Sequence, residues 1–104
     1  MLKQIQKIGK SKDKRRVTLW NKKLVDAGFT IGQPIAIHAS TSAISIAIDA
    51  TGKRKVSGVM NHGNELPVID LKETKSLSLA MLGEIGGKVS VSIEAGKITI
   101  KSAE

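Results

Sequence analysis

The feature that most restricts the fold of this chain is an internal repeat with a period of 54 residues. Moving the sequence along itself by that distance places Ile31-Gly32 on Ile85-Gly86. The match extends to the end of each half, where Ile44-Ser45-Ile46 meets Ile98-Thr99-Ile100. Two copies are too few for a solenoid, so we expect two halves that share one hydrophobic core.

Each half predicts the same order of elements. Alternation of apolar and polar residues predicts strands at 3–9, 15–20, 35–39 and 43–48, and again at 55–60, 67–72, 88–93 and 98–101. Short helices are expected from Asn21 to Ala27, with Gly28 as the stop, and over 75–82. Residues 49–66 are the connector. A unit of about 50 residues is marginal alone, so the repeats 1–50 and 53–104 are expected to interlock as one domain.

The positive charge is concentrated at the start of the chain. The whole protein has a net charge of +8 and a sequence pI near 10.0. Residues 1–23 account for that entire net charge, because they hold one acid, Asp13, and nine basic residues, which are Lys3, Lys7, Lys10, Lys12, Lys14, Arg15, Arg16, Lys22 and Lys23. A basic segment on a neutral body indicates an anionic partner, with nucleic acid first. A flexible basic tail is the competing interpretation, and the interleaved Val17 and Leu19 argue against it.

The sequence lacks the residues that several classes of function require. With no Cys and one Trp and one Phe, the chain offers no thiolate zinc site and little aromatic surface on which bases could stack. We find no nucleophile motif, and so expect no enzyme, no catalytic residue, no metal, no cofactor and no small-molecule substrate. Residues 27–48 carry no charge, but they alternate like a hairpin rather than a membrane span. With no signal peptide either, we expect a cytoplasmic, nucleoid-associated protein with no membrane partner.

The pattern also resembles a known family. The residues that carry it are Arg16-Val17-Thr18-Leu19, Lys22-Lys23-Leu24, Gly28-Phe29-Thr30-Ile31-Gly32 and Ile44-Ser45-Ile46, and in the second half Pro67-Val68-Ile69-Asp70-Leu71, Ile85-Gly86-Gly87-Lys88-Val89 and Gly96-Lys97-Ile98-Thr99-Ile100. They are similar to the SpoVT/AbrB-type swapped-hairpin family, here in two tandem copies. The resemblance implies a mainly β fold with short helices, namely a duplicated swapped-hairpin, AbrB-like β-barrel that forms a pseudo-dimer within one chain.

The resemblance further implies a function. Members of the family bind double-stranded DNA as transcription regulators, so we expect a repressor of a small operon, often its own, on a plasmid or other mobile element. In the family, basic residues of the first strands and the short helix contact DNA, which implies Arg16, Lys22 and Lys23. With the charge map added, the candidate DNA-binding residues are Lys7, Lys10, Lys12, Lys14, Arg15, Arg16, Thr18, Asn21, Lys22, Lys23, Lys53, Arg54 and Lys55. We expect Arg15 and Arg16 to carry specificity and the lysines to carry affinity.

The sequence also departs from the family pattern. Arg15 and Trp20 stand where the family has Gly and Pro, and Asp70 stands where the repeat of Arg16 would be. One chain therefore cannot present a symmetric basic face, and we expect the first half to make most DNA contacts and a dimer of chains to read a palindrome. The alternative is an antitoxin or a SymE-like member that binds RNA or a partner protein. We expect Trp20 to pack on the core and His38 to be a packed or surface residue.

Overall fold

The computed structural model describes residues 2–20, 23–61, 63–74 and 77–103. These residues are mainly strand, with two short helical turns. In chain order the elements are β1 (Leu2–Lys7), β2 (Gly9–Ser11), β3 (Lys14–Trp20), α1 (Lys23–Asp26), β4 (Pro34–Ala39), β5 (Ala43–Ile48), β6 (Arg54–Lys55), β7 (Ser57–Asn61), β8 (Asn64–Lys72), the 3₁₀ helix η1 (Ala80–Leu82), β9 (Lys88–Glu94) and β10 (Lys97–Ser102).

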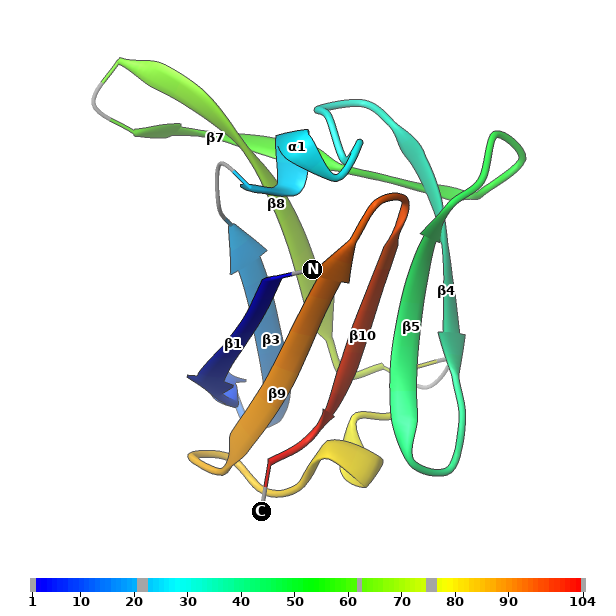
Figure 1. Cartoon of the computed structure of the whole chain (residues 1–104). Coiled ribbons are helices and arrows are strands. Elements are labelled where there is room, and N and C mark those ends of the chain that lie inside the picture. Colours follow the sequence, from blue (N-terminus) through cyan, green and yellow to red (C-terminus); the bar gives the residue numbers. More distant parts are fainter. Residues whose placement is uncertain (1, 21–22, 62, 75–76, 104) are drawn as a thin grey trace.

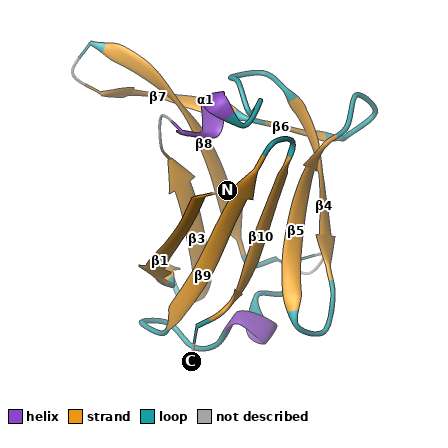
Figure 2. Cartoon of the chain, in the orientation of Figure 1, coloured by secondary structure: helices purple, strands orange, loops and turns teal. Residues whose placement is uncertain are grey.

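The strands form two antiparallel sheets that pack face to face (Figures 1 and 2). The larger sheet has the order β1-β9-β10-β5-β4-β6, and the smaller sheet has the order β2-β3-β8-β7. Every second side chain of the central strands points between the sheets, where the buried residues are all apolar among those described. The predicted strands are therefore present, because alternation along each strand supplies one apolar face to a shared core.

Both sheets contain strands from both halves of the sequence. β1 pairs with β9, β3 with β8 and β5 with β10, so each of these pairs joins the first half to the second. Val17 lies opposite Leu71 in one pair, and Ser45 lies opposite Thr99 in another. In both cases the two opposed residues are one repeat length apart in the sequence.

Two of the crossings between the sheets occur at single buried residues, Ile8 and Val56, so each of the strands expected at 3–9 and 55–60 is in fact two strands in different sheets. The Ile8 N–H donates to the Gly87 carbonyl at 2.8 Å, and the Gly86 N–H donates to the Ile8 carbonyl at 2.9 Å. Val56 makes the same two bonds with Gln33 and Gly32, at 3.0 and 2.8 Å. The turns at Gly32 and Gly86, which the repeat had aligned, thus hold equivalent crossing points.

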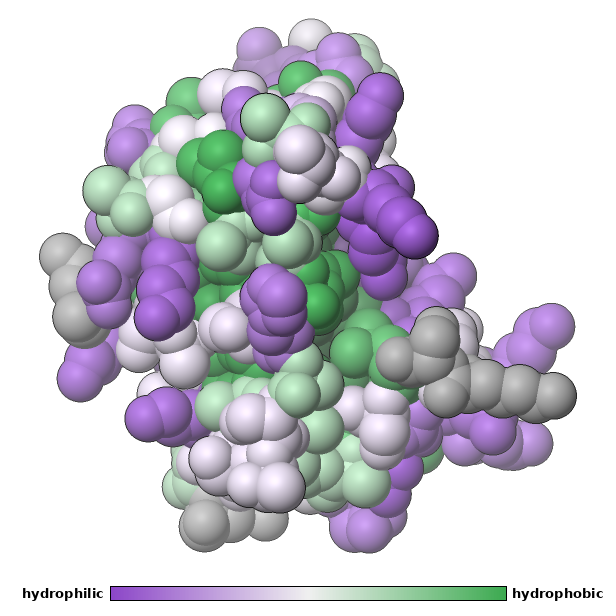
Figure 3. Space-filling model, turned by 90° about the vertical axis from the view of Figure 1, so that its right-hand side faces the viewer, coloured by the Kyte–Doolittle hydropathy of each residue, from purple (hydrophilic) through white to green (hydrophobic). Residues whose placement is uncertain are grey.

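The expected closed barrel is not found among the described residues. The larger sheet ends at β1 and β6 and the smaller sheet ends at β2 and β7, so neither order returns on itself. β1 covers all but one residue of β9, whereas β6 pairs with only Pro34 and Ile35 of β4. On the side of the molecule where β4 lies, apolar surface remains visible between hydrophilic side chains (Figure 3). Because β6 is so short, most of the outer edge of β4 has no partner strand among the described residues.

The first helix ends where the sequence predicted. Gly28 has a φ of 96°, the Gly28 N–H donates to the Val25 carbonyl, and the Phe29 N–H donates to the Leu24 carbonyl. These two bonds form a Schellman motif, which favours Gly because a left-handed residue closes it. The expected start at Asn21 lies outside the described residues, and so does Lys22. Buried Leu24 and Phe29 fix the turn to the core.

The second expected helix is wrong over most of its described part, 77–82, where only Ala80–Leu82 is helical; residues 75–76 lie outside the described residues. Two backbone groups that a helix over 75–82 would use are bonded elsewhere. The Leu79 N–H donates to the Glu73 carboxylate, and the Leu77 carbonyl accepts from the Thr74 N–H. These bonds replace helical ones, so the helical turn starts late.

The predicted connector 49–66 holds β6, β7 and the first residues of β8 rather than a plain loop. Gly52 is needed there, because a Cβ at this position would lie 2.2 Å from the Ile35 carbonyl oxygen. The β7–β8 hairpin extends away from the rest of the molecule (Figure 1). Over the described ranges, no helix is long and apolar enough to cross a membrane.

Candidate nucleic-acid interface

Three of the predicted lysines lie together on the β2–β3 hairpin. Lys10 is on β2, Lys12 is in the two-residue turn and Lys14 begins β3, and all three are exposed. Lys12 has a φ of 57°, a left-handed conformation that is uncommon for a residue with a Cβ. The strand β2 is an edge of the smaller sheet, so the hairpin presents a basic two-stranded ribbon to solvent.

Alternation along β3 divides its two arginines between opposite faces. Val17 and Leu19 are buried in the core, and Arg15 shares their side of the strand. Arg16 shares the outer face with Lys14 and Thr18. The structure therefore brings Arg16 together with Lys14 on the outer face, whereas Lys10 lies opposite Arg15 on the other face of the ribbon. Arg15 itself turns toward the inside of the molecule.

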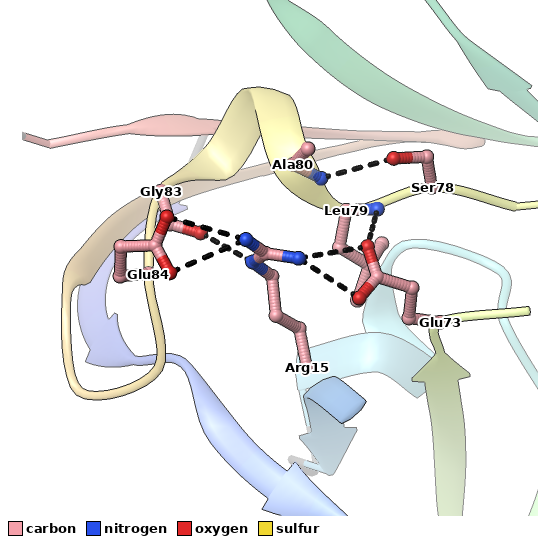
Figure 4. A network of polar contacts seen from close by, with 7 residues as sticks. All are labelled: Arg15, Glu73, Ser78, Leu79, Ala80, Gly83 and Glu84. Carbon is pink, nitrogen blue, oxygen red and sulfur yellow. Dashed lines mark hydrogen bonds and ion pairs between the residues drawn. The ribbon is translucent and has the colours of Figure 1, made fainter. Parts of the chain in front are cut away.

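Arg15 is the centre of an internal polar network (Figure 4). Its Nε donates to the Gly83 carbonyl at 2.7 Å, its Nη1 donates to Glu73 Oε1 at 2.9 Å, and its Nη2 lies 3.3 Å from Glu84 Oε1. The hydrogen bond to Glu73 raises the pKa of Arg15, against the opposing effect of desolvation. The hydrogen bond from the Leu79 N–H is the largest of the effects that lower the pKa of Glu73. Arg15 thus ties β3 to the segment around η1.

Arg16 forms a two-point ion pair on the outer face of the smaller sheet. Its Nε and Nη2 donate to the two carboxylate oxygens of Asp70, both at 2.8 Å, and Thr18 Oγ1 donates to Asp70 at 3.1 Å. Partial burial raises the pKa of Asp70, but the hydrogen bonds from Arg16 and Thr18 outweigh it and the net pKa is lowered. The Arg16 side chain keeps 38% of its surface exposed.

Two further cations contact Asp70, one at its carboxylate and one at its backbone carbonyl. Lys72 Nζ lies 3.9 Å from Asp70 Oδ2, and Arg54 Nη2 donates to the Asp70 carbonyl at 3.1 Å. Arg54 was a predicted site residue from a distant segment, whereas Lys72 was missed. The β3–β8 register, which places Lys72 opposite Arg16, is the signal that identifies it. We define the outer basic face as Lys14, Arg16, Thr18, Arg54 and Lys72.

The remaining candidates are distributed elsewhere. Lys53 and Lys55 are exposed on either side of Arg54, and Lys23 is exposed on α1. Lys7 lies at the end of β1, on the outer side of the larger sheet. Asn21 and Lys22 lie outside the described residues, as does the side chain of Trp20. His38 is exposed on β4, a surface position as expected.

A shallow groove of about 440 Å³ borders the outer basic face. Arg16 and Thr18 line one side, and Val68 with residues Ser57 to Met60 of β7 line the other. Val59 and Met60 are 43% and 66% exposed. The groove therefore joins a basic wall to an apolar wall, and in the described ranges no three His, Asp or Glu side chains cluster as metal ligands.

Comparisons of this chain with protein-family models, with curated proteins and with solved structures find no match.

Proposed function

We propose that this chain is a double-stranded DNA-binding transcription regulator, a repressor of a small operon, often its own, on a plasmid or other mobile element. The proposal includes a duplicated swapped-hairpin fold of the SpoVT/AbrB type. It is supported by the strand pairs that join the two halves, by the opposed residues one repeat apart, and by the two equivalent crossings at Ile8 and Val56. These features are what a fused dimer would have.

The observation that carries the function is the β2–β3 hairpin. A two-stranded antiparallel ribbon can enter the major groove of DNA, which is about 12 Å wide. This ribbon places Lys10, Lys12 and Lys14 within a few residues of one another at an exposed tip. Lys12 adopts a left-handed backbone conformation in which glycine would be unstrained. Backbone strain of this kind is often retained at functional sites.

We assign distinct roles to the basic residues. Lys10, Lys12 and Lys14 contact phosphates and supply affinity, because a flexible ammonium group suits a phosphate. Arg16 reads a base edge, with Asp70 holding the guanidinium in place. Arg15, whose nitrogens all donate within the protein, has a structural role instead. Specificity thus rests on one arginine per chain, so a palindrome requires two chains.

Binding measurements at two salt concentrations test the proposal. The wild type would be titrated against a duplex that contains an inverted repeat from its own promoter, a scrambled duplex, a single strand and a structured RNA. We expect the promoter duplex to bind most tightly, with a logarithmic salt slope of about −2.7 if three lysines meet phosphates. Equal and salt-insensitive binding to all four ligands would refute the function.

One observation favours the alternative of a partner-protein-binding antitoxin. Val59 and Met60 are exposed on β7, beside the groove that Arg16 lines. Aromatic residues, Met and Arg are the types enriched at protein interfaces. If Met60→Lys leaves promoter binding unchanged but abolishes retention of a co-expressed toxin, this second function would replace the first.

A further inference from the structure

The outer face of the larger sheet carries a second set of hydrogen-bonding and basic side chains. Strand registers align Lys3, Ser92, Thr99, Ser45 and His38 in one row across β1, β9, β10, β5 and β4. At about 4.8 Å per strand the row is about 19 Å long. All five residues can donate a hydrogen bond, counting the imidazole.

Lysines flank this row on both sides. Lys101 lies opposite Ser90 in the row below it, and Lys97 lies opposite Glu94 in the row above it. Lys3, Ser90, Ser92, Glu94, Thr99 and Lys101 line a shallow depression of about 260 Å³. The hydroxyl side chains between the lysines are small, so an extended ligand can approach the sheet closely.

The fold groups basic residues of the second half on one face of the larger sheet. Along the sequence, residues 24–104 have no net charge. In space, three of their acids, Asp70, Glu73 and Glu84, are paired with Arg15 and Arg16. The lysines of β10 instead lie with Lys3 of the first half, on a face where Glu94 is the one acid that shares their rows among the described strands.

The lysines on this face keep their charges available. Within the described residues, Lys3, Lys97 and Lys101 have no carboxylate within 4.0 Å. Glu94 is opposite Lys97 in the described strand register but forms no ion pair with it. Arg15 and Arg16 on the smaller sheet are by contrast held by carboxylates at 2.9 and 2.8 Å. The lysines on the outer face of the larger sheet are therefore less neutralised than Arg15 and Arg16. This face points away from the outer basic face, on the other side of the core (Figure 1).

We propose that the outer face of the larger sheet binds the phosphate backbone of a second DNA duplex, so that one chain bridges two duplexes. The inference rests on the proposed function, because the first duplex occupies the β2–β3 hairpin and the outer basic face. A 19 Å length of duplex carries about eleven phosphates, which is ample for Lys3, Lys97 and Lys101. The hydroxyls of Ser92, Thr99 and Ser45 donate to the backbone between them, and no base is read.

Two variants that each lose three charges separate the two faces. The sheet variant is Lys3→Gln, Lys97→Gln and Lys101→Gln, and the hairpin variant is Lys10→Gln, Lys12→Gln and Lys14→Gln. One duplex is fixed to beads and a second, fluorescent duplex is added with the protein. We expect the wild type to retain the second duplex, and both variants to bind a single duplex without retaining another.

Salt dependence supplies a second readout. In the hairpin variant, which keeps Arg16, Arg54 and Lys72 on the outer basic face, the contacts of Lys3, Lys97 and Lys101 should contribute about −2.7 to the logarithmic salt slope. That contribution lowers affinity about 40-fold between 50 and 200 mM salt. Circular dichroism melting of both variants checks that they fold. Because the substituted side chains are exposed or lie at strand ends, melting temperatures close to that of the wild type are expected.

The outcomes distinguish this proposal from the proposed function. A sheet variant that bridges as well as the wild type overturns the second site and leaves the first intact. A hairpin variant that keeps full affinity for one duplex refutes the first site instead. Loss of binding to vesicles of anionic lipid in the sheet variant, with no second duplex held by the wild type, assigns the face to a membrane surface and also overturns the proposal.

Discussion

Replacing Lys12 by glycine should make the protein more stable and make it bind DNA less well. Lys12 has a φ of 57° in the hairpin turn. That conformation costs a residue with a Cβ about 1–2 kcal/mol. Glycine avoids this cost but loses about 0.4–1 kcal/mol through the greater freedom of the unfolded chain. The difference leaves a stabilisation of roughly 1 kcal/mol, which for a domain of this size raises the melting temperature by about 5 °C.

The effect on DNA binding has the opposite sign. Loss of one phosphate contact reduces the logarithmic salt slope by about 0.9, which corresponds to about fivefold weaker binding at 0.15 M salt. Lys12→Ala is the matched control, because it removes the charge but keeps the Cβ. It should bind as weakly as Lys12→Gly without the gain in melting temperature. The assays are thermal unfolding and fluorescence anisotropy with a labelled promoter duplex.

Two results would refute this reasoning separately. If Lys12→Gly melts at or below the temperature of Lys12→Ala, the turn is not strained in the way that its φ indicates. If Lys12→Gly binds the duplex as tightly as the wild type, the hairpin tip does not contact DNA. The pair of variants thus tests the backbone and the charge independently.

Three other predictions concern the pseudo-symmetric pair of strands β3 and β8. Asp70→Asn should raise affinity for non-specific duplex severalfold and reduce the preference for the promoter, because Arg16 loses both the neutralising charge and its orientation. A competition gel shift that shows unchanged preference would contradict the role of Asp70. Since the pKa values of Asp70 and Glu73 are lowered by folding, their stabilisation is complete above about pH 5.5, beyond the unfolded-state values, and is lost as pH falls through the lowered values. Melting curves from pH 7 to pH 2 should therefore show a smaller acid-induced decrease in Glu73→Gln than in the wild type, and parallel curves would contradict the pairing. Leu71→Ala, which opens a cavity opposite Val17, should lower the free energy of unfolding in urea by about 2–5 kcal/mol, whereas a loss below 1 kcal/mol would show that the core collapses around the site.

Local patterns in the sequence were enough to predict most strands and one helix end. The hairpins at 34–39 with 43–48, and 88–94 with 97–102, follow from strict alternation of apolar residues. Gly28 ends its helix because only a left-handed residue closes that turn. The helix expected at 75–82 is wrong over most of its described length, because helix propensity contains no information on the bonds that the Leu79 N–H makes with Glu73 and the Leu77 carbonyl makes with the Thr74 N–H. The single strand expected at 55–60 is divided at Val56 into β6 and β7, which belong to different sheets, and imperfect alternation in this glycine-containing stretch did not show the break.

The candidate site was predictable in part. Alternation in β3 already places Arg15 on the side of Val17 and Leu19, so its inward direction could have been predicted from the sequence. The carboxylates that meet it, Glu73 and Glu84, could not, because they are 58 and 69 residues away and are brought there by the η1 segment. For the same reason the alignment of Lys3 with Thr99 depends on strand pairings that a local pattern does not contain.

The Arg16–Asp70 ion pair explains how two similar halves can have different roles. The two residues are separated by 54 positions, the repeat length, and they lie beside the Val17–Leu71 pair, whose members are also one repeat apart. Arginine at both positions would place two like charges at this point of the β3–β8 pair. Aspartate in the second half replaces that repulsion by a two-point ion pair, which favours pairing of β3 with β8 over pairing of β3 with another β3. The same substitution removes one arginine from the outer face of the smaller sheet, so the choice of partner strand and the unequal charge of β3 and β8 both follow from one residue.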